Sequence, residues 1–124
     1  NKNMDITKKR EAGFLNIINQ NPDIQYQSIY TDSAEEAKKI ILKVKNLENF
    51  DGIFAMSDEV LAGLNIALQI KRISDFSELR IIAISEGLLP KYLNSNYEYV
   101  KNDGISMGME AAEKLLAQIK SNKK

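Results

Sequence analysis

The sequence predicts an α/β fold in which a parallel sheet lies between helices on both faces, giving three layers. Stretches with helical spacing of apolar residues alternate with short apolar runs of strand length along most of the 124 residues. The chain length, with 44% hydrophobic and 27% charged residues, fits one globular domain. Strands that are joined through helices pair in parallel with right-handed crossovers, so one sheet is expected.

The first half of the chain contains two predicted helices and two predicted strands. In chain order these are a helix over Asp5–Asn19, a strand over Ile24–Tyr30, a helix that begins at Ser33 and a strand over Ile53–Met56. The first strand is predicted from alternating apolar and polar side chains, and the second from a short apolar run typical of a buried strand. Ser33 and Glu36 match a capping box, which makes the start of the second helix the clearest feature.

The second half continues the alternation. Its predicted elements are a helix capped by Ser57, a strand over Ile81–Ile84, an irregular segment between Gly87 and Pro90, a turn at Asn94-Ser95-Asn96, a brief strand over Tyr97–Val100 and a last helix capped by Asn102 or Asp103. The last helix has an apolar stripe at intervals of four, three, four and three residues, formed by Ile105, Met109, Ala112, Leu116 and Ile119. Such a stripe has to be buried against something.

Composition excludes several function classes. Seventeen basic and seventeen acidic residues cancel, so no overall basic field attracts nucleic acid. The chain has no cysteine and no histidine, which removes thiolate metal sites, a cysteine nucleophile and histidine-centred catalysis. No apolar run approaches the length of a membrane span or of a signal-peptide core. We therefore expect a cytoplasmic protein that is not an enzyme and needs no cofactor or metal.

The polar residues that follow the predicted strands are the candidate ligand contacts. In open parallel sheets, ligands bind beyond the carboxyl ends of the strands, where loops and helix N-termini meet. The residues at these positions are Thr31, Asp32, Ser57, Asp58, Ser85 and Glu86.

Four ordered segments resemble the effector-binding region of LacI-type transcription regulators, whose fold is that of periplasmic sugar-binding proteins. They are Arg10-Glu11-Ala12-Gly13-Phe14, similar to Arg-x-x-Gly-Phe; Ile53-Phe54-Ala55-Met56-Ser57-Asp58 with Gly63; Ile81-Ile82-Ala83-Ile84-Ser85-Glu86, in the place of a strand ending Gly-Phe-Asp-Asp; and Met107-Gly108 with Ala111 and Ala112. The resemblance implies the C-terminal half-domain of a periplasmic-binding-protein-like fold over residues 1–92. Residues 93–124 would then form a crossover and a helix that normally packs on a first lobe.

The resemblance also implies partners. Family members carry a helix-turn-helix headpiece and a first lobe ahead of the Arg-x-x-Gly-Phe segment, and neither lies in these 124 residues. The expectation is a truncated sensor that binds a small, sugar-like effector weakly or not at all, contacts DNA only through the missing headpiece, has no membrane partner and forms a homodimer. The last helix is expected to dock on its own lobe or on a second copy.

Each site residue has a functional and a structural interpretation. The resemblance makes Arg10 an effector grip, whereas an exposed first-turn arginine is the structural alternative. Asp58 can bind a sugar hydroxyl, but capping of a helix is the stronger expectation. Ser85 and Glu86 replace the family's aspartate pair, which leaves the effector's identity open. Tyr30 can stack on a sugar, although packing in a strand is more common.

Three alternatives to a regulator are weighed. A sugar-binding lobe for transport or chemotaxis has the same fold and is the main competitor. A phospho-receiver domain requires an acidic pair after its first strand, and the segment that ends Tyr30-Thr31-Asp32 lacks one. No nucleophile with a base, phosphate loop or metal-ligand cluster supports an enzyme.

Overall fold

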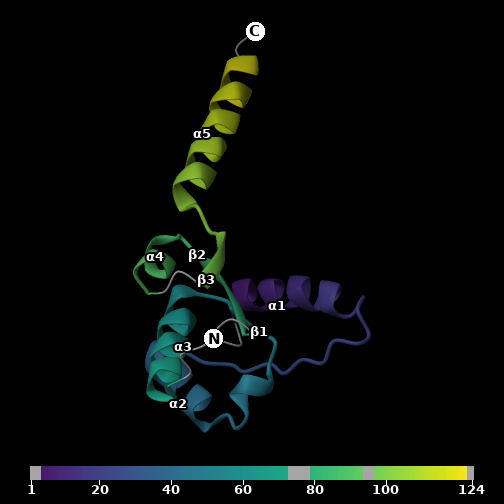
Figure 1. Cartoon of the computed structure of the whole chain (residues 1–124). Coiled ribbons are helices and arrows are strands. Elements are labelled where there is room, and N and C mark those ends of the chain that lie inside the picture. Colours follow the sequence, from purple (N-terminus) through teal and green to yellow (C-terminus); the bar gives the residue numbers. More distant parts are fainter. Residues whose placement is uncertain (1–3, 73–78, 94–96, 123–124) are drawn as a thin grey trace.

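A computed structural model describes residues 4–72, 79–93 and 97–122 (Figure 1). One sheet contains three parallel strands in the order β1-β2-β3, which span Gly52–Ala55, Arg80–Ser85 and Tyr97–Lys101. Ile53 lies opposite Ile81, and Ala83 lies opposite Tyr99. The predicted α/β fold with a parallel sheet and flanking helices is confirmed. The predicted turn at residues 94–96 lies outside the described residues.

The helices begin where local capping chemistry places them. They are α1 (Asp5–Ile18), α2 (Ala34–Lys43), the 3₁₀ turn η1 (Leu47–Asn49), α3 (Asp58–Ile70), α4 (Leu88–Leu93) and α5 (Gly104–Ser121). Ser33 Oγ accepts the Glu36 amide at 3.1 Å, and Ser57 Oγ accepts the Val60 amide at 3.3 Å. Asp103 caps α5 in the same way. The predicted caps at Ser33 and Ser57 are therefore confirmed, and of the two candidates for the last helix Asp103 is the cap.

Helix α3 occupies the centre of the molecule, between α2 and the sheet. Leu61, Leu64 and Leu68 are its largest fully buried side chains, and they form one core cluster with residues of all three strands. The α2 helix approaches α3 closely at Gly63, where an added Cβ atom would lie 2.8 Å from the Cβ of Ala37. A side chain at Gly63 would thus push the two helices apart.

One hydrogen bond between polar side chains crosses this apolar core. The Tyr97 hydroxyl donates to Asn65 Oδ1 at 2.7 Å, and both residues are buried. Burial raises the pKa of Tyr97 above its ordinary value. The bond connects β3 to α3 and satisfies two groups that would be costly to bury alone.

The Ile24–Tyr30 strand prediction is wrong, because this segment is extended and exposed without joining the sheet. An alternating pattern becomes a strand only when a neighbour accepts its backbone hydrogen bonds. The amide of Arg80 in β2 donates to the carbonyl of Asp51. Successive carbonyls of a strand point to opposite sides, so the carbonyl of Met56, five residues on, points away from β2 towards the outer edge of β1. The side chain of Arg10 donates a hydrogen bond to that carbonyl.

The Gly87–Pro90 segment also differs from the prediction, since α4 forms where an irregular segment was expected. Pro90 is the third residue of α4. A proline in the first turn costs no intrahelical hydrogen bond, because the amides of that turn have no partner within the helix.

Helices cover the two sheet faces unequally. Helix α3 buries the face that contains Ala55, Ile81 and Ala83. On the opposite face, α1 contributes a ring stack of Phe14 on Phe54 with centroids 4.9 Å apart. Elsewhere on that face, Ile82 is 41% exposed and Val100 is 60% exposed. The second outer layer is therefore partial.

Helix α5 extends away from the rest of the chain, beyond the carboxyl end of β3 (Figure 1). Within the described residues it packs against no other helix or strand, and it has no buried residue. Of the two docking places expected for this helix, the structure shows no packing on its own lobe, and docking on a second copy stays a prediction. Its apolar side chains remain in solvent, with Ile105 79% exposed.

We predict that Tyr97→Phe lowers the free energy of unfolding by about 1–3 kcal/mol, because it leaves the buried Asn65 oxygen without its donor. Urea denaturation measures this change. Tyr92→Phe is the matched control, because Tyr92 is exposed. Equal stability of the two variants would contradict the role given to the buried bond.

We predict that the first turn of α5 loosens in acid. Hydrogen bonds from Ser106, and then Lys101, lower the pKa of the Asp103 carboxyl from 3.8 to about 2. A lowered pKa means that the cap's contribution is complete above pH 3.8 and is lost as the pH falls through about 2. The Ser106 amide resonance should follow this titration in NMR spectra, and in Asp103→Asn it should not. A wild-type midpoint at 3.8 or above would refute this.

Candidate functional site

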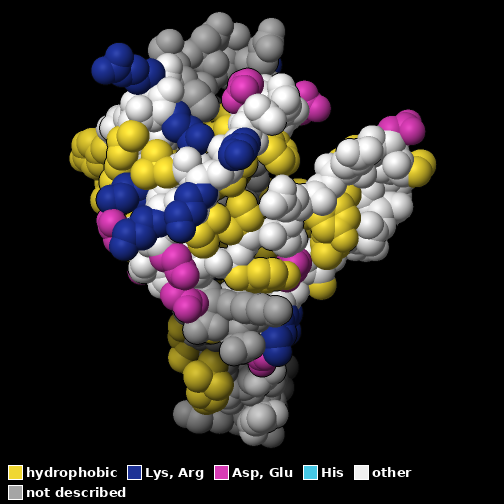
Figure 2. Space-filling model, turned by 90° about the horizontal axis from the view of Figure 1, so that it is seen from below, with side chains coloured by type: hydrophobic (Ala, Val, Ile, Leu, Met, Phe, Trp, Pro, Cys, Tyr) yellow, Lys and Arg dark blue, Asp and Glu magenta, His cyan; other side chains and the backbone are white. Residues whose placement is uncertain are grey.

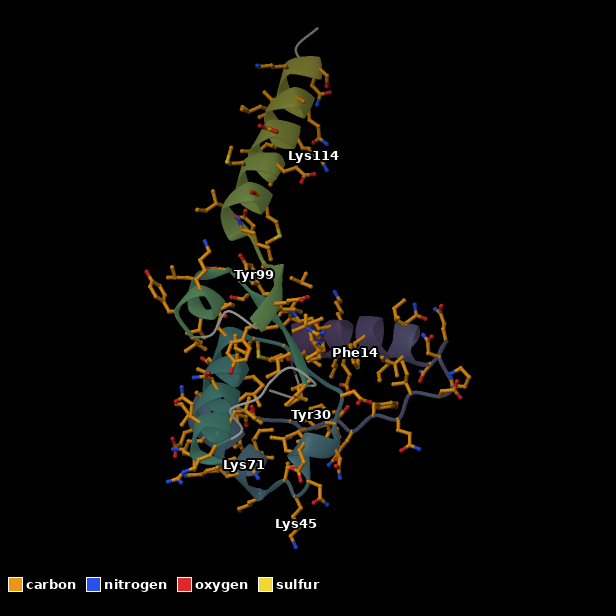
Figure 3. All side chains as sticks on the ribbon, in the orientation of Figure 1. Phe14, Tyr30, Lys45, Lys71, Tyr99 and Lys114 are labelled. Atoms are coloured by element: carbon orange, nitrogen blue, oxygen red, sulfur yellow. The ribbon has the colours of Figure 1, made fainter. Side chains whose placement is uncertain are left out.

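Arg10 reaches the sheet edge where β1 ends. Its Nη1 donates to the carbonyl oxygen of Met56 at 2.8 Å. The Phe14 stack on Phe54 lies one helical turn further along α1, so both contacts come from the same face of the helix. Figure 3 shows the labelled Phe14 between α1 and the sheet. Two contacts therefore hold α1 at this edge and bring a guanidinium group with several further N–H donors.

Asp58 opens α3 two residues after Met56. Its Oδ1 is buried and has no hydrogen-bond partner among the described residues. Burial of an unpartnered carboxylate oxygen is costly, so a hydrogen-bond donor placed at this oxygen would be stabilising. The unpartnered Asp58 oxygen thus belongs to a residue two positions after Met56, whose carbonyl Arg10 contacts.

Ser85 ends β2 but is only 2% exposed. Its Oγ accepts the amide of Gly87 at 2.9 Å, and its carbonyl accepts the amide of Asn102 at 2.8 Å. Gly87 has a φ of +99°, and the ring of Tyr99 occupies the space that a side chain there would need. The polar groups of Ser85 therefore hold a turn, whereas Glu86 is exposed at the edge.

Tyr30 attaches the extended segment to α1. Its hydroxyl donates to Glu11 Oε1 at 2.6 Å, and Ser28 Oγ donates to the same oxygen at 3.3 Å. The hydrogen bond to the Glu11 carboxylate raises the pKa of Tyr30. Sequence reasoning missed Glu11, although its position directly after Arg10 could have suggested it. Nearby, the amide of Asp32 donates to the Glu36 carboxylate.

A groove of about 380 Å³ has a different lining. It is lined by Gln27, Ile29, Ile40, Lys43, Val44, Lys45 and Phe50, so none of the predicted contacts takes part. Lys71 Nζ donates to the carbonyl of Val44 beside it. Figure 2 shows basic and hydrophobic side chains side by side on the molecule, in a view from below.

Two further features of the described residues concern other classes of function. No group of three or more histidine, cysteine or acidic side chains in this part of the chain could hold a metal ion. None of the helices described is long and apolar enough to cross a membrane.

We predict that Arg10→Ala lowers the free energy of unfolding by about 1–2 kcal/mol, since it removes a partly buried, charge-assisted hydrogen bond to Met56. Lys9→Ala on the exposed side of α1 is the control, and it should change stability by less than about 0.5 kcal/mol. Urea denaturation of both variants measures the difference. Equal values would show that the contact does not hold α1 in place.

No family model matches the chain, and neither a curated protein nor a solved structure does so.

Proposed function

We propose that this chain is the effector-sensing lobe of a LacI-type regulator with a periplasmic-binding-protein-like fold. The observation that carries the proposal is that Arg10 binds the carbonyl of Met56 directly after β1, two residues before Asp58 opens α3. Arg10, in the segment that resembles Arg-x-x-Gly-Phe, reaches the carboxyl end of β1, where the buried Asp58 oxygen has no hydrogen-bond partner among the described residues. Donor and acceptor groups at this edge suit a ligand that carries both kinds of group.

A sugar-like effector satisfies these groups. A ligand hydroxyl donates to Asp58 Oδ1, and free N–H groups of Arg10 donate to a ligand oxygen in charge-assisted hydrogen bonds. Ser85 is buried beneath the turn, where its hydroxyl accepts the Gly87 amide, so the contact after β2 falls to the exposed Glu86. This difference from an aspartate pair would select a different effector from that of regulators that retain the pair.

Regulation then follows from differential binding. In regulators of this kind, a second lobe forms the other wall of the cleft, and the effector favours one closure of the two lobes. That closure changes how a homodimer in the cytoplasm presents its headpieces to DNA. The edge of a single lobe offers few contacts, so affinities in the millimolar range are expected for the lobe alone.

NMR titration of the isotope-labelled chain with D-ribose, D-glucose and D-galactose, each added separately, tests the binding site. We predict amide shifts at Ser57, Asp58 and Glu86 with at least one sugar. Arg10→Ala and Asp58→Asn should abolish the shifts, whereas Lys9→Ala should retain them. Shifts confined to the groove beside Lys43 and Lys45, no shifts with any of the three sugars, or submicromolar affinity would contradict the proposal.

The reading frame around the coding sequence tests the regulatory role separately. A helix-turn-helix segment encoded upstream in the same frame is the expected result. A secretory or lipoprotein signal there would instead make the chain part of a binding protein for transport or chemotaxis.

A further inference from the structure

The groove at the C-terminal end of α2 combines an apolar lining with positive charge. Its volume of about 380 Å³ lies in the range of about 300–1,000 Å³ that is typical of sites for small molecules. We propose that it binds a small organic carboxylate with an apolar body. The carboxylate lies beside Lys43 and Lys45, and the body contacts the apolar side chains of the lining, which are Ile29, Ile40, Val44 and Phe50.

One wall of the groove comes from the extended segment that does not join the sheet. Tyr30 and Ser28 both donate to Glu11 Oε1, at 2.6 and 3.3 Å, so their side chains point towards α1. Successive side chains of an extended chain point to opposite sides, which turns Gln27 and Ile29 away from α1 and into the groove. Two hydrogen bonds to one carboxylate therefore hold this wall in place.

The other wall is the last turn of α2 and the loop that follows it. Ile40 and Val44 are four residues apart, so they lie on one face of this turn. The carbonyl of Val44 accepts a hydrogen bond from Lys71 Nζ at 2.9 Å, which ties the end of α2 to the residue after α3. Asn46 has a φ of +57° and turns the chain into η1, after which Phe50 also lines the groove. The bond from Lys71 places a third ammonium group at this wall.

The charges of the groove have one sign, because none of its lining residues is acidic. Among the described residues, neither Lys43 nor Lys45 forms an ion pair. In contrast, Lys38 and Lys39 on the same helix both pair with Glu35. The C-terminal end of a helix stabilises a lysine such as Lys43, but Lys45 lies beyond the helix. An anion in the groove would give both lysines a partner.

A carboxylate with an apolar body suits this lining better than a purely polar or a purely apolar ligand. An inorganic anion would leave Ile29 and Phe50 in water, where they are 39% and 37% exposed. A neutral hydrocarbon would leave the two lysines without a counter-charge. A neutral sugar offers neither a charge nor a large apolar body, so this site differs from the one proposed at the carboxyl edge. The two proposals can therefore fail separately.

NMR titration of the isotope-labelled chain with sodium phenylbutyrate tests the proposal. We predict amide shifts at Gln27, Lys45 and Phe50, with no shifts at Asp58 and Glu86. A ligand of this size in an open groove should have a dissociation constant in the millimolar range. Two matched compounds separate the contributions, since phenylbutyramide lacks the charge and butyrate lacks the ring. Each should bind at least about fivefold more weakly than phenylbutyrate.

Substitutions of the lysines test the charge directly. Lys43→Gln and Lys45→Gln should each raise the dissociation constant of phenylbutyrate about two- to fivefold, as expected for exposed charge pairs. Lys39→Gln is the matched control, because it removes the same charge from α2 outside the groove and should change the constant by less than about twofold. An unchanged urea midpoint shows that each variant keeps its fold.

Ionic strength supplies a readout without substitutions. An increase from about 0.01 M to about 1 M salt shortens the screening length from about 30 Å to about 3 Å. Binding of phenylbutyrate to the wild-type chain should weaken over this range, and binding of phenylbutyramide should not.

Three results would overturn the proposal. They are no shift of the groove residues with phenylbutyrate, equal affinity for phenylbutyrate and either matched compound, or equal affinity of phenylbutyrate for Lys39→Gln and for the double variant Lys43→Gln with Lys45→Gln.

Discussion

Because β1, β2 and β3 pair in parallel, all three strands end at the same edge of the sheet, and every return crossing has to run over a face. Helix α3 provides the crossing between β1 and β2, and it fills the centre of the core with leucines. Its first residue, Asp58, is fixed at the edge as a result. The candidate site is thus a consequence of strand direction and of the Ser57 cap, rather than of a separate loop.

The same constraint explains the unequal surfaces. A parallel sheet has two faces to bury, and α3 with α4 covers one of them. Helix α1 covers only the part of the other face near Phe54, and α5 lies beyond the sheet instead of on it. The side chains that hold α1 also bring Arg10 to the carboxyl edge. Helix α1 therefore covers part of this sheet face through Phe14 and also supplies Arg10 to the candidate site.

Local chemistry was predictable from the sequence, and long-range partners were not. The caps at Ser33, Ser57 and Asp103 depend on residues within three positions, and these predictions are confirmed. The Ile24–Tyr30 prediction failed because a strand needs backbone hydrogen bonds to a neighbouring strand, and this segment pairs with none of the three strands described. For the site, strand order predicted that Asp58 and Ser85 follow strands. The engagement of Ser85 with Gly87 depends on a left-handed turn, and the sequence marked Gly87 only as the start of an irregular segment, without a partner for it.

The central claim is that the carboxyl edge holds a small polyhydroxylated ligand between Arg10 and Asp58. A crystal structure of the chain soaked with the sugar that binds most tightly tests it most directly. The account predicts a ligand hydroxyl within hydrogen-bond distance of Asp58 Oδ1 and a second ligand oxygen on the Arg10 guanidinium. Ligand density found only in the groove beside Lys43 and Lys45, with Asp58 still unpartnered, would contradict it.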